Sequence, residues 1–410
     1  MKNRRIDIYN LDVIIPSVIF GLQYFNWIVN YKITQGLLLY EKITDIKTNF
    51  IYITLFVAFQ IGIILPTLFA DLIEGNKSFP YRYVRLSERV KANRQILKVL
   101  LFTVLVGLIG YSLPIIQNPT IIIDALRRMY LPTIQAYIRV KKVGLLSSLF
   151  NNALLWYAVC FVSDYHNILE DRKKLLLYFS LITLYSILFS ERMYLIYFLI
   201  IYVFALEMNG RRVRIVSLLK VILAAVVLII VIEVFRFSLA QLIMPQSHVD
   251  IKVVISAFKL SRDRILIGYL GSDVNNALYM IKWSNSINPL AYTVFDKIFK
   301  NYMVGDVGPG LNTGFGTVSL MGIMWLRYNV LSYFTLFIRG FLIGLIMMLP
   351  KHSSSEYAKY MYCIVIPAII TFVRIDYFGT TVFLIPFFSL CLLYFIDSAN
   401  VRKRNQYDFN

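Results

Sequence analysis

Arginine side chains in several separate segments are the first residues that suggest a chemistry. Arg192 and the adjacent Glu191 form the only charged break between two apolar runs, and Arg236 directly follows another apolar run. A guanidinium group stays charged at any accessible pH and binds phosphate oxygens through two parallel hydrogen bonds. These positions are candidate binding sites for a phosphate-bearing ligand, together with Arg127, Arg128, Arg262 and Arg264.

Two of these arginines also have a purely structural interpretation. Arg192 can pair with Glu191 to cap the turn of a helical hairpin. Arg236 can extend toward the headgroups of a membrane, beside Glu233 one helical turn away. Charged groups at membrane depth are costly and usually face a protein interior or a wet cavity, so both interpretations stay open.

Candidate acids and bases accompany the arginines in the segment 262–276. Asp263 and Asp273 lie there with Asn275 and Asn276, and carboxylate and amide groups beside cations suit a sugar-phosphate ligand. An exposed turn with alternating charges explains the same pattern. Of the three histidines, only His248 lies in the longest gap between apolar runs. It is a candidate general base or an ordinary loop histidine.

The sequence lacks the common motifs of metal, nucleotide and serine chemistry. It contains no HExxH, DDxxD, GxSxG or GxGxxG pattern and no P-loop. The three cysteines, Cys160, Cys363 and Cys391, lie in separate apolar runs and form no CxxC pair. We therefore expect no metal site, no disulfide and no cofactor.

The composition requires a membrane around these residues. Of 410 residues, 58% are hydrophobic and only 16% are charged, whereas an ordinary soluble protein has roughly 25% charged residues. At about 20 apolar residues per span, a chain of this length has room for roughly ten transmembrane helices. We therefore predict an all-α polytopic membrane protein, with residues 1–410 forming a single integral membrane domain. The expected spans are 13–29, 48–70, 99–123, 143–163, 175–190, 193–206, 221–232, 331–349, 360–373 and 377–396.

The net charge of +19 mostly sets the orientation of the spans. Basic residues concentrate in the segments 71–98 and 208–220 and in the tail at Arg402, Lys403 and Arg404. By the positive-inside rule these segments belong in the cytoplasm, together with both termini. This explanation disfavours binding to nucleic acid, the other common reason for such a basic chain.

Two regions on the expected outer side carry cations that the rule does not explain. The first is 117–143, with Arg127 and Arg128, and the second is the long loop region 236–328. A merely solvated basic loop remains an alternative for the second, because long loops escape the charge rule. However, the region is rich in aromatic residues and includes five glycines between 305 and 316. This composition predicts amphipathic or re-entrant helices near a bound ligand.

Four stretches carry a family resemblance. They are DALRRMY (124–130), LFSERMYLI (188–196), IGYLGSDVNNAL (267–278) and GLNTGFGTVSLMGIMW (310–325). With the span layout, they make the chain similar to the O-antigen and oligosaccharide repeat-unit polymerases of bacteria, the Wzy-type family. One departure is SLMG at 319–322, where the family has an aromatic element before its next span.

The resemblance implies a glycosyltransferase of the bacterial inner membrane. Such an enzyme polymerises undecaprenyl-pyrophosphate-linked oligosaccharides on the periplasmic face, in the pathway of lipopolysaccharide, and its partners include a chain-length regulator and a flippase. The implied base candidates are His248, Asp263 and Asp273. The arginines implied to bind pyrophosphate are Arg192, Arg236, Arg262 and Arg264, with Arg127 and Arg128 on the second substrate.

Three alternatives remain at this point. A flippase acts on the same lipid-linked glycans, but its helices are evenly spaced, whereas this chain has one long gap at 236–328. An O-antigen ligase has a similar layout and differs mainly in its acceptor, which would make His248 more prominent. A non-catalytic scaffold would not need the charges of Arg192, Glu233 and Arg339 at the edges of spans.

Overall fold

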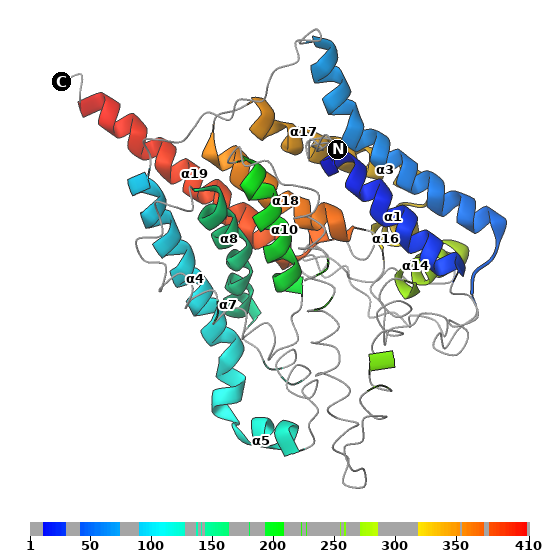
Figure 1. The fold of residues 1–410 in the computed structure, drawn as a ribbon, viewed down its shortest axis with the longest axis horizontal. Helices are drawn as coiled ribbons and strands as arrows, with labels where there is room; N and C mark the ends of the chain where they lie inside the picture. Colours follow the sequence, from blue (N-terminus) through cyan, green and yellow to red (C-terminus); the bar gives the residue numbers. More distant parts are fainter. Residues whose placement is uncertain are drawn as a thin grey trace, which may run out of the picture.

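The computed structural model describes residues 11–29, 42–73, 90–127, 144–163, 193–208, 271–285, 319–352, 355–372 and 377–407, with a few isolated positions between them. These segments consist mainly of helices, and none of them contains a strand (Figure 1). The predicted all-α class is therefore confirmed for the described part of the chain.

The helices differ in length from single turns to long rods. The structure gives α1 Leu11–Val29, α3 Ile46–Ile73, α4 Val90–Gln117, α5 Thr120–Arg127, α7 Gly144–Ser148, η2 Leu149–Asn152, α8 Ala153–Val162, α10 Met193–Met208, α14 Ser272–Lys282, α16 Leu320–Tyr328, η6 Asn329–Leu331, α17 Ser332–His352, α18 Glu356–Thr371, η7 Tyr377–Gly379 and α19 Thr381–Tyr407.

Within the described segments, four helical stretches are long and apolar enough to cross a membrane. They are Ile46–Phe69, Gln95–Gln117, Leu320–Pro350 and Thr381–Ser398. In Thr381–Ser398 only 11% of the residues are buried inside the protein. Most of this apolar helix must therefore be surrounded by another apolar medium. The chain is therefore a helical membrane protein. Of the predicted spans, 175–190 and 221–232 lie outside the described residues, apart from isolated positions.

Two predicted spans are interrupted. The expected span 99–123 ends at Gln117, and α5 starts anew at Thr120, because Pro119 disfavours a helical conformation at the residue before it. The expected span 143–163 is divided into α7, the 3-10 turn η2 and α8. At the other end of the chain, α19 starts only after η7 and continues through the basic tail to Tyr407.

The contact between α3 and α17 is the most extensive among the described helices. Glycines allow their backbones to touch: a methyl group at Gly340 would clash with the carbonyl oxygen of Phe59, and one at Gly62 would lie 2.8 Å from the amide nitrogen of Phe341. A methyl group at Gly344 would lie 2.9 Å from Pro66 Cγ. Small residues at helix contacts are typical of membrane proteins, where close packing replaces the hydrophobic effect between helices.

The centre of the bundle is α8, which contacts α4, α10, α18 and α19. Nine of its ten residues are buried, and a helix that is apolar on all sides belongs in an interior. Figure 1 shows the start of α1, the end of α3 and the end of α19 on the upper side. The C-terminal end of α1 lies next to α14 on the right. We call this side of the bundle the α14 end and the opposite side the C-terminal end.

Candidate functional site

Among the site residues predicted from the sequence, Asp273 has a side chain that the structure describes. Arg127 is the last residue of α5, and its side chain is not described. The other predicted residues lie outside the described part of the chain, and their roles stay predictions. They are Arg128, Arg192, Arg236, His248, Arg262, Asp263 and Arg264.

Asp273 lies in the first turn of α14 and has no exposed surface. Asn275 and Asn276 of the same helix are each only 2% exposed. The first turn suits a carboxylate, because the helix dipole is positive there. An exposed turn, the alternative considered for this segment, is therefore wrong at these three residues.

Asn275 joins α14 to two distant segments. Its side-chain Oδ1 accepts a hydrogen bond from the backbone nitrogen of Ile43 at 3.1 Å. The same atom accepts a second hydrogen bond from Trp27 Nε1 of α1 at 3.4 Å. Because a buried amide oxygen needs hydrogen-bond donors, Asn275 fixes α14 against the end of α1 and the approach to α3.

The start of α3 forms a polar network next to this contact. Asp45 Oδ2 accepts hydrogen bonds from the backbone nitrogen of Thr48 at 2.9 Å and from its hydroxyl at 2.6 Å, as an N-cap residue does. These bonds hold the pKa of Asp45 below its usual value. Tyr24 of α1 donates a hydrogen bond to Asn49 Oδ1 at 2.8 Å, and Asn49 Nδ2 donates to the Ile43 carbonyl at 3.3 Å.

Tyr52 and Ser319 complete the surroundings of Asp273. Both have no exposed surface, and the Tyr52 hydroxyl lies beside Ser319 and within electrostatic range of Asp273. Ser319 Oγ caps α16 by accepting a hydrogen bond from the Gly322 nitrogen at 3.4 Å. A carboxylate in such a position is costly to bury. We call Asp273, Asn275, Tyr52 and Ser319 the Asp273 cluster.

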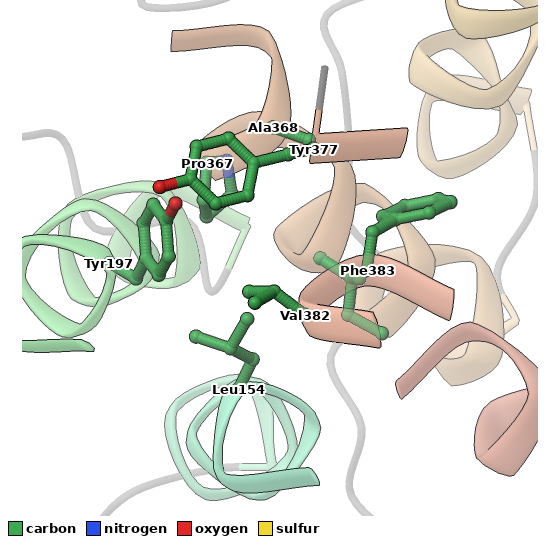
Figure 2. Close-up of a pocket in the computed structure, with 8 residues that line it drawn as sticks. Leu154, Tyr197, Pro367, Ala368, Tyr377, Val382 and Phe383 are labelled. Carbon is green, nitrogen blue, oxygen red and sulfur yellow. The ribbon is translucent and has the colours of Figure 1, made fainter. Parts of the chain in front are cut away.

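A small apolar cavity lies between α8, α10, α18 and α19. Its walls include Leu154, Pro367 and Phe383, and the rings of Tyr197 and Tyr377 meet edge to face with centroids 5.6 Å apart. Figure 2 shows the two tyrosines on one side of the cavity and Val382 with Phe383 on another. Such a lining fits a hydrocarbon segment and offers few partners for a sugar.

A second buried polar group lies where α8 ends and α18 begins. Tyr360 donates a hydrogen bond to Glu356 Oε2 at 2.9 Å, and its oxygen lies 2.9 Å from Ser163 Oγ. Lys359 is only 2% exposed and interacts with the charge of Glu356. These contacts connect α8 to α18, a structural role.

Among the described residues, no three histidine, cysteine, aspartate or glutamate side chains converge as a metal site would require. All three cysteines are free thiols.

No protein-family model, curated protein or solved structure matches the chain.

Sequence reasoning did not identify Trp27, Tyr52 and Ser319 as neighbours of the 272–276 segment. Ser319 had a local signal, because a serine directly before an apolar run is a typical N-cap. Trp27 and Tyr52 had none, since each lies inside an apolar stretch more than 200 residues away from Asp273.

Proposed function

We propose that the protein is a glycosyltransferase that polymerises undecaprenyl-pyrophosphate-linked oligosaccharide units into O-antigen or a similar surface polysaccharide. In this proposal the α14 end faces the periplasm, the C-terminal end faces the cytoplasm, and the membrane is the bacterial inner membrane. The observation that supports it best is the burial of Asp273 among polar groups at one end of an apolar bundle. This residue lies within 267–278, one of the stretches that carry the resemblance.

The proposed reaction transfers the growing glycan from its lipid pyrophosphate to a hydroxyl group of a new lipid-linked unit. The bond between the sugar C1 and the pyrophosphate oxygen breaks, and a bond between C1 and the acceptor oxygen forms. The acceptor proton passes to a base, and undecaprenyl pyrophosphate leaves with the bonding electron pair. Cations that contact this leaving group stabilise its developing charge, so a strong general acid is not required.

The arginines outside the described residues supply these cations in the proposal. Arg192, Arg236, Arg262 and Arg264 contact the leaving pyrophosphate, while Arg127 and Arg128 contact the diphosphate of the acceptor. Asp263 or His248 accepts the proton. Because Asp273 has no exposed surface, its proposed role is to position the substrate-facing residues of its segment through its charge, and not to touch the substrate.

Deleting the gene and restoring it with variants tests the proposal. Loss of a polymerase leaves a single repeat unit on lipopolysaccharide, whereas loss of a flippase or ligase leaves none. We expect the Arg192→Ala variant to reproduce the single-unit pattern and Arg192→Lys to recover part of the chain ladder, because lysine keeps the charge without the bidentate geometry. A normal ladder from Arg192→Ala would remove Arg192 from the mechanism.

A further inference from the structure

Three lysines gather at the α14 end, outside the Asp273 cluster. Lys42 precedes α3, Lys47 lies in its first turn and Lys282 is the last residue of α14. Lys47 and Lys282 are exposed, and both act electrostatically on Asp45. Residues from two segments more than 200 positions apart in the sequence thus surround one carboxylate.

Two tryptophans accompany these lysines. Lys42 Nζ lies 4.5 Å from the ring centroid of Trp27, and Lys282 Nζ lies 5.5 Å from that of Trp283. Trp283 is 45% exposed, whereas Trp27 is only 3% exposed. Tryptophan and lysine are the residues that concentrate where a membrane meets water. We call Lys42, Lys47, Lys282, Trp27 and Trp283 the lysine–tryptophan rim.

Apolar side chains next to the rim are open to the surroundings. Ile46 is 85% exposed and Phe50 66% exposed on α3, while Phe25 is 63% and Val29 59% exposed on the last turns of α1. Apolar groups this exposed belong in the hydrocarbon of a bilayer. The rim therefore lies at the boundary between the lipid chains and their headgroups.

Two exposed lysines of the rim lie near the carboxylate of Asp45. Lys47 and Lys282 both act on Asp45, whose Oδ2 already accepts hydrogen bonds from Thr48. Lys42 Nζ instead donates a hydrogen bond to the Ile28 carbonyl at 3.2 Å. The other end of α3 leads into the basic segment 74–98, so the positive-inside rule places the rim on the opposite side of the membrane. Lys47 and Lys282 therefore do not serve orientation, and because both are exposed they can contact an anionic group of the membrane.

We propose that the lysine–tryptophan rim binds the phosphate of an anionic phospholipid in the leaflet at the α14 end. The ammonium groups of Lys47 and Lys282 contact the phosphate, and the acyl chains lie along Ile46 and Phe50. Trp283 fixes the depth of the headgroup through its contact with Lys282, and the buried Trp27 holds Lys42 at the rim. This site is independent of the proposed polymerase activity.

Site-specific photocrosslinking of the full chain tests this proposal. We would place p-benzoylphenylalanine at Ile46, next to Lys47, and at Phe388, a 56% exposed position on α19, as the matched control. Each protein is reconstituted in vesicles of equal parts phosphatidylglycerol and phosphatidylcholine, irradiated, and analysed by mass spectrometry for the attached lipid. Because Ile46 is highly exposed, the replacement leaves the packing of α3 unchanged.

We expect the anionic lipid to be enriched at position 46, on the order of fivefold for each lysine that contacts it. At position 388 the two lipids should be attached in proportion to the mixture. The Lys47→Gln and Lys282→Gln double variant should lose the enrichment at position 46. Equal attachment of both lipids at position 46, or enrichment that survives the double variant, would overturn the proposal.

Discussion

Asn275 Oδ1 and the backbone nitrogen of Ile43 are joined by a 3.1 Å hydrogen bond between residues 232 positions apart. The same oxygen accepts from Trp27, so one amide group holds three segments of the chain together. Asn275 is separated by one residue from Asp273, and this contact therefore also fixes the position of the buried carboxylate.

Replacing Asn275 tests this relationship. Asn275→Ala removes the acceptor and leaves the Ile43 amide and the Trp27 indole buried without it, which costs about 1–3 kcal/mol. We expect a lower thermal unfolding temperature of the purified protein in detergent. Asn275→Gln is the matched control because it retains a neutral side-chain amide oxygen and should unfold closer to the original protein.

Asp273→Asn separates stability from function. Asparagine has nearly the same shape without the charge, so the cost of burying a carboxylate disappears. We expect an unfolding temperature equal to or above that of the original protein, together with shorter polysaccharide chains in the complemented deletion strain. Full-length chains from this variant would show that the charge of Asp273 has no part in the activity.

Gly340→Ala tests the close contact of α3 and α17. A methyl group there would clash with the Phe59 carbonyl, and the helices must separate to accommodate it. Overpacking of this kind typically costs about 1–3 kcal/mol. Gly21→Ala is the control, because nothing lies within 4 Å of a methyl group at Gly21 in α1. Thermal unfolding of both variants should show a loss for the first and no loss for the second.

The N-cap of α3 predicts that the stability of the first turn of this helix depends on pH. Hydrogen bonds from Thr48 lower the pKa of Asp45 in the folded protein, so its contribution to stability is present above the unfolded pKa. That contribution is lost as the pH falls through the lower, folded pKa. Hydrogen exchange of the Thr48 amide should therefore accelerate relative to mid-helix amides on acidification. In Asp45→Asn, whose cap does not titrate, this acceleration should be absent.

Two of the expected spans agree closely with the observed helices, because an apolar run is a local property. The span expected at 48–70 corresponds to α3, and 13–29 to α1, within a few residues. The division of 143–163 was not predictable in the same way, because it accompanies a contact from another helix: Gly107 of α4 lies directly against Phe150 in η2. The 340–344 GxxxG pattern was a usable signal for the α3 contact that was not recognised.

The candidate site was predicted only in part. Asp273 was selected from its neighbours in the sequence, and the structure does place it among polar groups. Its burial could not be inferred, because the groups around it come from α1, α3 and α16 and are brought together only by packing. An exposed turn with alternating charges was one alternative for this segment, whereas Val274, Ala277 and Leu278 of α14 have no exposed surface.

Reconstitution of the reaction tests the polymerase proposal most directly. The purified chain would be placed in proteoliposomes with the lipid-linked repeat units that accumulate in the deletion strain, and the glycans and released lipid would be measured together. The proposal predicts chains of two or more units and one undecaprenyl pyrophosphate released for each new glycosidic bond. Repeat units that remain single, with no release of undecaprenyl pyrophosphate, would contradict it.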